Sequence, residues 1–359
     1  MRYAIILAGG TGSRFWPLSS PLEPKQFLKV CSNKTMLGQT IERVSPLIKR
    51  NNIYLACGKI YGQKIKSCLI DFKIPGGNIF LEPQGRNTLA PIAFLSKRIH
   101  QTDPEAIIAV FPCDHFIKDC AGLLELLKEA MDAARDGRII TFGVVPRRPE
   151  TGYGYIKVKM GIGHRAEGIG GRKQKIYDVE RFTEKPDLAK AKRFRRDKRY
   201  YWNSGIFIFK AKTMLEETRR LAPEVYNILT KISGKNDVNR FWPKLPSLSM
   251  DYAIMEKTKN IALLPLDCGW VDLGSWQAIG EIIKKDKRGN VFKGNCIDMG
   301  SKNTVVWSEG PSLLATLGLE DIIVVNTNGA LLVCAKSKAQ EVKKIAQALG
   351  KKRAVKGIF

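Results

Sequence analysis

The amino-acid sequence predicts an α/β fold: a Rossmann-like, mixed but mainly parallel sheet with helices on both faces, followed by a small C-terminal β-domain. Two observations predict it. Over residues 1–145, near-continuous apolar runs of strand length alternate with segments of helical spacing, which is typical of a buried parallel sheet. After residue 286, short β-segments are broken by glycine and asparagine. The length of 359 residues suits two domains, which we expect over 1–285 and 286–359.

Each predicted element has its own pattern. Apolar, β-rich runs predict strands at 3–8, 52–57, 78–82, 106–112 and 138–145, and the spacing between them predicts helices near 35–49, 60–71, 88–100 and 120–136. An antiparallel ribbon is expected from 151–159 and 177–186, then a basic helix near 187–200, a strand at 203–211 and helices to about 258. In the C-terminal part, turn residues such as Thr327-Asn328-Gly329 separate short strands, and a last helix is expected over about 337–350, ending at Gly350.

The composition narrows the class of protein. Apolar residues make up 44% and charged residues 26%, as in ordinary globular proteins. No apolar run reaches the length that spans a bilayer, and the N-terminal run is too short for a signal peptide, so we expect a cytoplasmic protein without a membrane partner. The eight cysteines form no CxxC pair and the three histidines lie far apart, which argues against a zinc site and a disulfide framework.

The charge is the unusual part of the composition. Lys and Arg number 60 against 34 Asp and Glu, a formal net charge of +26. Such a charge favours anionic ligands in general and would make nucleic acid stick at low salt. The basic stretch 190–199 is better read as a solvated helix face, so nucleic acid is not the expected partner.

The segment LAGGTGSRFWPLSSPLEPKQF at 7–27 is the most informative motif. Gly9, Gly10 and Gly12 directly follow a predicted buried strand, where they allow a sharp turn and bring backbone N–H groups close to a phosphate. Arg14 and Lys25 add two cations to the same loop. The pattern is neither a Walker loop nor a complete Rossmann fingerprint. A glycine-rich surface turn is the alternative, but the cations favour phosphate binding.

This segment resembles the signature of the sugar-1-phosphate nucleotidylyltransferases. Other segments are similar, more narrowly, to the mannose-1-phosphate guanylyltransferases, and they occur in the expected order: EPQGRNTLAPIA at 82–93, FPCDHFI at 111–117, TGYGYI at 151–156, FTEKP at 182–186, WNSGIF at 202–207 and WVDLGSW at 270–276. The resemblance covers nearly the whole chain. It implies a nucleotidylyltransferase catalytic domain over 1–285.

The resemblance also implies roles for single residues in nucleotide binding. The backbone around Leu7, Gly9, Gly10 and Gly12 would hold the nucleotide, with Arg14 and Lys25 as catalytic cations at its phosphates. Gly85, Arg86 and Asn87 would lie near the base and ribose.

Two aspartates are the expected metal ligands and catalytic carboxylates. By resemblance, Asp114 and Asp272 together hold one Mg²⁺, a hard cation that prefers carboxylate oxygens. Taken alone, each has a plainer reading, Asp114 as a helix cap and Asp272 as a turn residue.

The sugar phosphate is assigned by resemblance to a third set of residues, which as isolated residues would be read as turns or a bulge: Tyr153, Gly154, Glu184, Lys185 and Asn203. Glu184 would contact the sugar hydroxyls, Lys185 the sugar phosphate, and Asn203 the hexose.

The implied activity is the reaction of GTP with α-D-mannose 1-phosphate to give GDP-mannose and diphosphate. Because the C-terminal β-domain of this family often mediates dimers, the resemblance also allows a homodimer. Two alternatives stay open. One is a nucleotidylyltransferase that uses UTP or dTTP with glucose 1-phosphate, and the other is a non-catalytic sugar-nucleotide sensor. The GRNT and WNSGIF segments favour mannose, and the reactive side chains Arg14, Lys25, Asp114 and Asp272 favour catalysis.

Overall fold

The computed structural model describes residues 1–165 and 175–356, and the chain groups into two compact units. The first unit comprises residues 1–9, 40–113 and 117–270, and the second comprises residues 10–39, residues 114–116 and the chain from Val271 onward. The predicted boundary between two domains, 1–285 and 286–359, stays a prediction.

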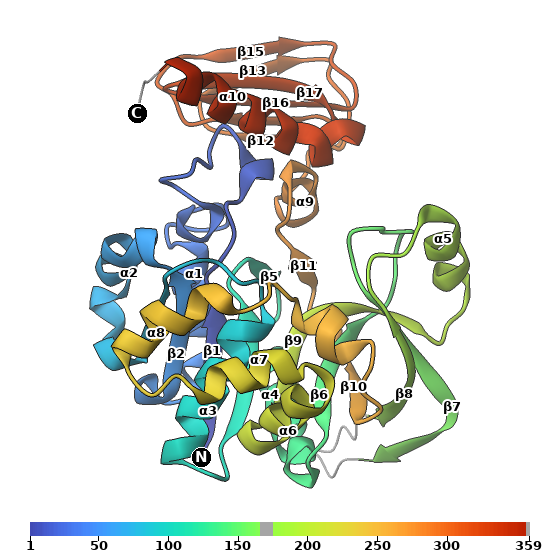
Figure 1. Cartoon of the computed structure of the whole chain (residues 1–359). Helices are drawn as coiled ribbons and strands as arrows, with labels where there is room; N and C mark the ends of the chain where they lie inside the picture. The colour runs from blue at the N-terminus through green and yellow to red at the C-terminus, as the bar shows by residue number, and fades with distance from the viewer. Residues whose placement is uncertain (166–174, 357–359) are drawn as a thin grey trace. The chain divides into compact units, whose positions relative to one another are not determined.

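A nine-stranded mixed sheet forms the centre of the first unit (Figure 1). Its order is β3-β2-β1-β4-β9-β6-β10-β8-β7, with the bounds β1 Arg2–Leu7, β2 Ile53–Gly58, β3 Ile79–Glu82, β4 Ile107–Pro112, β6 Ile139–Val144, β7 Tyr155–Arg165, β8 Lys175–Thr183, β9 Tyr200–Lys210 and β10 Ile261–Pro265. Only β8 and β9 run against the direction of the others. The predicted fold class, a mixed and mainly parallel sheet, is confirmed.

Helices cover both faces of this sheet because its central strands are apolar on both sides. Tyr3 and Ile5 of β1 join a buried cluster with α3 (Leu89–Thr102), α6 (Ala211–Leu221) and α7 (Pro223–Thr230). The alternate residues Ala4 and Ile6, also fully buried, face the opposite side. There α4 (Cys120–Ala133) packs against β4, β6 and β9.

The remaining helices of the first unit agree with the predicted segments. They are α2 (Gly62–Leu69), α5 (Leu188–Arg196) and α8 (Lys235–Phe241). The predicted helix at 35–49 is shorter: α1 spans Met36–Val44, since Pro46 disfavours helical geometry at the residue before it.

The second unit is built largely from short parallel strands. Two sheets have the orders β12-β14-β16-β17 and β13-β15, with the bounds β12 Val291–Lys293, β13 Cys296–Met299, β14 Val305–Ser308, β15 Leu314–Leu317, β16 Ile322–Thr327 and β17 Ala330–Ala335. Val305 pairs with Ile323 and Cys296 with Leu314, each 18 residues onward, so the chain winds in stacked coils. Among the described strands of these two sheets, β16 and β17 alone form a hairpin, whose turn Asn328-Gly329 lies at the predicted position.

Three aromatic rings pack together within the apolar core of the second unit. Trp276, in α9 (Trp276–Ile282), packs at 5.5 Å from both Phe15 and Trp307. The last α-helix begins and ends later than predicted. A 3-10 helix covers Lys336–Glu341, and α10 spans Val342–Lys356. Gly350 therefore does not end it, because an isolated glycine costs only about 1 kcal/mol in a helix.

Candidate active site

The glycine-rich loop of the second unit depends on Gly12. Gly10 and Gly12 have φ angles of +94° and +63°, which non-glycine residues avoid. A Cβ at Gly12 would lie 2.7 Å from the Cβ of Lys25 and 2.8 Å from its backbone nitrogen. The Gly12 carbonyl accepts a hydrogen bond from Ser19 Oγ at 2.6 Å. The loop therefore folds back so that Lys25 lies against the glycine turn.

Lys25 forms an ion pair and hydrogen bond with Asp114. Both side chains are largely shielded from solvent, with 18% and 15% exposed. Burial would raise the pKa of Asp114, but the Lys25 ammonium and the neighbouring His115 outweigh it and hold this pKa below its ordinary value. The carboxyl group is thus ionised at neutral pH.

Asp272 is brought next to Asp114 by β-pairing. Asp114 directly precedes β5 (His115–Ile117), Asp272 ends β11 (Trp270–Asp272), and these strands form a small sheet. The Leu273 backbone N–H donates to the Asp114 carbonyl at 3.0 Å. Ligand atoms of Asp114, His115 and Asp272 all lie within 4.8 Å of one another. Two carboxylates at this spacing fit a hard divalent cation.

The Arg14 side chain lies beside Gly274, close to Asp272. Its Nη1 donates to the Gly274 carbonyl at 3.2 Å, and a Cβ at Gly274 would lie 3.2 Å from that nitrogen and 3.5 Å from Asp272 Oδ2. The second unit thus brings together all four residues predicted as catalytic. Sequence reasoning missed His115, although its place directly after Asp114 was a signal.

The predicted sugar-binding residues gather in the first unit. Glu184, only 6% exposed, pairs with Lys185, whose own φ is +45°. A Cβ at Gly154 would lie 2.5 Å from Glu184 Oε2, so only glycine leaves room beside this carboxylate. The ring of Tyr153 contacts Trp202 and Trp270 edge-on, with centroids 5.4 and 5.5 Å away.

Asn203 and Asp251 complete this group. Asn203 Nδ2 donates to Asp251 Oδ1 at 2.9 Å, and the Asn203 backbone N–H donates to the Gly154 carbonyl at 2.8 Å. Burial, together with the charge of Glu184, raises the pKa of Asp251 to about 7. Sequence reasoning missed Asp251, which lies in a helical turn with no glycine or proline to draw attention.

The segment Gly85–Asn87 lies after β3 in the first unit. Arg86 Nη2 donates to Gln84 Oε1 at 2.8 Å and to the Pro243 carbonyl, and Asn87 has a φ of +61°. Trp242 Nε1 donates to the Gln84 carbonyl at 2.8 Å. These bonds fix the backbone around Gly85, which has open space at its Cβ position.

Glu82 is a further residue that sequence reasoning missed. It ends β3, is 7% exposed, and its Oε2 has no hydrogen-bond partner among the described residues. Burial raises the pKa of Glu82 to about 7, even though the Arg86 backbone N–H bonds to it. A buried carboxylate oxygen without a partner is costly, so the group fits a site that donates to it when a ligand binds. Its signal in the sequence was a lone acid at the end of an apolar strand.

Comparison with known proteins places these features in a family. The nucleotidyl transferase family matches residues 3–289. The chain belongs to the nucleotidyl transferase family. The MannoseP isomerase/GMP-like β-helix domain matches residues 294–349, in agreement with the coiled strands of the second unit. The resemblance of the sequence motifs to this family is therefore confirmed, and with it the prediction of a nucleotidyltransferase.

Several members of the family resemble the whole chain. Mannose-1-phosphate guanylyltransferase 2 of Escherichia coli O157:H7 is 38% identical, over 96% of this chain and 73% of its own. Mannose-1-phosphate guanylyltransferase of Salmonella muenchen is 37% identical, over 96% and 72%. A crystal structure from Thermus thermophilus, described as a mannose-1-phosphate geranyltransferase, superposes with a TM-score of 0.86 at 30% identity, covering 97% of this chain and 99% of that one.

Among the described residues, no helix is both long and apolar enough to cross a bilayer.

Proposed function

We propose that the protein converts GTP and α-D-mannose 1-phosphate into GDP-mannose and diphosphate. The observation that carries this proposal is the cluster of the second unit, where Lys25 from the glycine-rich loop pairs with Asp114, and Asp114 lies beside Asp272. Cations next to paired carboxylates suit the transfer of a nucleotidyl group between phosphates. The names of the mannose-1-phosphate guanylyltransferases that resemble the whole chain support these substrates.

In the proposed reaction, an oxygen of the sugar phosphate bonds to the α-phosphorus of GTP. The bond from that phosphorus to the oxygen bridging to the β-phosphate breaks, and diphosphate leaves with the electron pair. Because the attacking oxygen is already anionic, no side chain has to remove a proton. The protein contributes position and charge.

Backbone N–H groups of Gly9, Gly10 and Gly12 are proposed to bind the phosphates of GTP. Arg14 and Lys25 then balance the charge that builds on the leaving diphosphate. Lys25 is held by Asp114, and an ammonium has further N–H donors to offer a phosphate. Arg14 is positioned by the Gly274 carbonyl and keeps its remaining guanidinium donors.

Asp114 and Asp272 are the proposed ligands of a divalent cation, and we propose Mg²⁺. The donor set fits, since both carboxylates are close enough to share one ion and the low pKa of Asp114 keeps it ionised. When bound, such an ion supplies positive charge at the reacting phosphates.

Residues of the first unit are proposed to bind mannose 1-phosphate. Glu184 accepts hydrogen bonds from sugar hydroxyls, and the space at Gly154 admits the ring beside it. Lys185 pairs with the sugar phosphate, and Asn203 and Tyr153 orient the hexose. Asp251 belongs to the same group because it is hydrogen-bonded to Asn203.

The base is proposed to lie at the carboxyl ends of β1 and β3, where Leu7 and the segment Gly85–Asn87 present backbone groups. Glu82 ends β3, and one of its carboxylate oxygens has no hydrogen-bond partner in the part of the chain that the structure describes. Guanine carries two adjacent donors on one edge, the N1–H and the 2-amino group, and a carboxylate accepts from both at once. Thymine and uracil offer one N–H there, so Glu82 favours guanine over the bases of the alternative reaction.

The proposal also covers the cellular location and the oligomeric state. We expect action in the cytoplasm and formation of a homodimer. Exposed apolar side chains on the short strands of the second unit support self-association: Ile297, Met299, Leu317, Leu331 and Val333. A role in nucleic-acid binding is not proposed, despite the net charge of +26.

A matrix assay tests the function directly. GTP, ATP, UTP and dTTP are each combined with mannose 1-phosphate and glucose 1-phosphate, with and without Mg²⁺, and diphosphate release is measured. We expect the highest kcat/KM for GTP with mannose 1-phosphate. A maximum for dTTP or UTP with glucose 1-phosphate would support the alternative transferase, and no release from any pair would support the sensor.

A further inference from the structure

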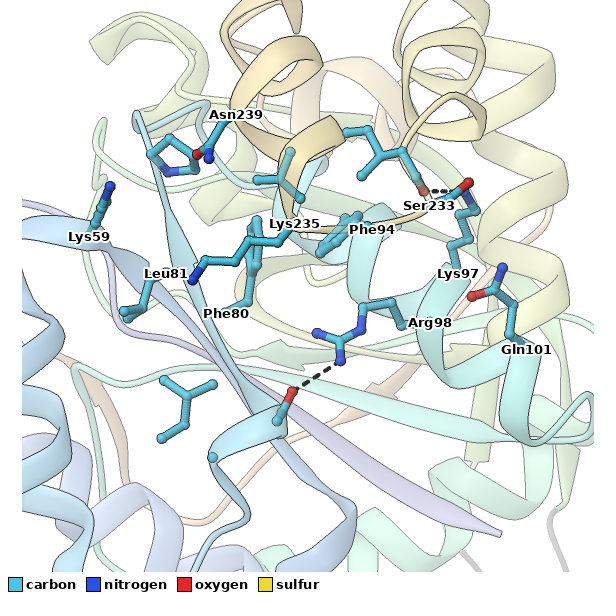
Figure 2. Close-up of a pocket in the computed structure, with 17 residues that line it drawn as sticks. Lys59, Phe80, Leu81, Phe94, Lys97, Arg98, Gln101, Ser233, Lys235 and Asn239 are labelled. Carbon is cyan, nitrogen blue, oxygen red and sulfur yellow. Dashed lines mark hydrogen bonds between the residues drawn. The ribbon is translucent and has the colours of Figure 1, made fainter.

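A pocket of about 620 Å³ opens along β3, the edge strand of the large sheet (Figure 2). Its walls come from β3 itself, from α3, and from residues 232–239 around the start of α8. All of these belong to the first unit. None of the candidate active-site residues lines it, so it is a separate cavity with the volume of a small-molecule site.

The charged side chains of this pocket are all cationic. Lys59, Lys97, Arg98 and Lys235 line it, and no carboxylate does so among the described residues. Lys97 has a structural role, since its Nζ donates hydrogen bonds to the carbonyls of Leu229 at 2.8 Å and Ile232 at 2.9 Å. The others remain able to bind an anion.

Those three cations reach the pocket from separate elements. Arg98 uses Nη2 for the Gly77 carbonyl at 3.1 Å, a bond drawn in Figure 2, which fixes the guanidinium and leaves other N–H donors. The amines of Lys59 and Lys235 make no hydrogen bond or ion pair with any described residue. Cations from three elements line one pocket, and this arrangement favours a ligand with several negative charges.

Part of the remaining lining is apolar, beside the polar side chains of Gln101, Ser233 and Asn239. Phe80 and Phe94 contact each other with centroids 4.5 Å apart, and both pack against the buried Trp242. Leu81 and Val238 extend this surface. A purely inorganic anion would leave it unused, whereas a ring or apolar body would cover it.

We propose that this pocket binds an organic phosphate, a molecule with one or more phosphate groups on a ring-shaped or apolar body. The phosphates pair with Lys59, Arg98 and Lys235, and the body lies along Phe80, Leu81 and Val238. This site is distinct from the proposed substrate sites and does not depend on their assignment.

The probe for the test is ADP, which carries two phosphates and a ring system, with inorganic phosphate as the comparison. Binding to the whole protein is measured by titration calorimetry at low salt. We expect one ADP to bind more tightly than phosphate, and Lys59→Glu/Lys235→Glu to weaken ADP at least tenfold. The matched control is Lys192→Glu/Lys198→Glu, which changes the net charge equally at exposed lysines outside the pocket. The control should retain the wild-type affinity.

Two more variants test the role of the apolar wall and the possibility that ADP binds at the proposed nucleotide site. Gly77→Phe adds bulk to the lining where a Cβ meets nothing within 4 Å, so it should fold normally and weaken ADP more than phosphate. Lys25→Ala tests whether ADP instead uses the proposed nucleotide site. Equal ADP affinity in the wild type and the Lys59→Glu/Lys235→Glu variant would overturn the proposal, as would loss of ADP binding in Lys25→Ala alone. Equal weakening of ADP and phosphate by Gly77→Phe would overturn the role of the apolar wall.

Discussion

Lys25 and Asp114, 89 residues apart in the chain, form an ion pair inside the second unit. The pair joins the glycine-rich loop to the carboxylate cluster, so a cation and the proposed metal ligands occupy one place. Asp272 lies next to Asp114, so the two carboxylates can share one cation. We therefore expect both to be needed for turnover.

Asp114→Asn and Asp272→Asn should each lower kcat by orders of magnitude, because each removes a negative ligand from the proposed cation. Steady-state rates of diphosphate release, measured over a range of Mg²⁺ concentrations, check this. Asp71→Asn is the control, since Asp71 is exposed and outside the cluster. Near-normal Mg²⁺-dependent turnover in either variant would remove that residue from the proposed site.

Gly12→Ala should impair the use of GTP. Alanine at a φ of +63° costs roughly 1–2 kcal/mol, and its Cβ would meet Lys25 at 2.7 Å, so the loop must move. We expect at least a tenfold loss in kcat/KM for GTP. Gly76→Ala, where a Cβ meets nothing within 4 Å, is the matched control and should leave kinetics unchanged. Wild-type kinetics for Gly12→Ala would show that the folded-back loop is not needed.

Lys185→Ala and Lys25→Ala should affect different substrates. A charge-assisted hydrogen bond is worth about 1.5–3 kcal/mol, or roughly ten- to hundredfold in binding. Lys185→Ala should raise the KM for mannose 1-phosphate by that factor, whereas Lys25→Ala should chiefly damage the use of GTP. The two substrates are varied separately in initial-rate measurements. If both variants shift both substrates alike, the proposed division between them is wrong.

Glu82 should make unfolding pH-dependent. Burial raises its pKa from an ordinary 4.5 to about 7, so the folded protein holds this proton more tightly than the unfolded chain. The stability that the protonated group contributes is complete below about pH 4.5 and is lost as pH rises through about 7. In urea unfolding at about pH 5 and about pH 8, Glu82→Gln should therefore lose less stability between the two values than the wild type. An equal loss in both proteins would contradict the buried carboxyl group.

The sequence predicted the large sheet well, since its evidence is local. Strands such as 106–112 are apolar throughout, which is typical of a strand buried on both faces of a sheet. The coiled C-terminal strands were predicted as β-structure, but not their parallel stacking. The pairing of Val305 with Ile323 depends on an 18-residue repeat, and only a few residues in each turn of the coil carry its signal.

The candidate site residues were predicted through motifs, and acids whose role depends on burial were missed even where, as at Glu82, they lie within a motif. Asp114 and Asp272 were expected to meet because of a resemblance, since nothing local relates two residues so far apart. Glu82 and Asp251 are proposed members of the site because they are buried next to polar groups, and burial of a carboxylate is a tertiary property. A single sequence shows which acidic residues are present but not which of them the fold shields from solvent.

The choice of GTP is the most direct test of the account. Initial rates are measured with mannose 1-phosphate and GTP, ITP or dTTP, in the wild type and in Glu82→Gln. Thymine lacks the 2-amino donor and turns a carbonyl oxygen toward Glu82, so one carboxylate oxygen loses its partner, which costs about 1–3 kcal/mol, and also meets a like partial charge. We therefore expect a preference for GTP over dTTP of roughly fivefold to a hundredfold or more in kcat/KM. ITP, which lacks the 2-amino group, should fall between them, and Glu82→Gln should narrow the gap between GTP and ITP. Equal kcat/KM for GTP and dTTP would contradict the account.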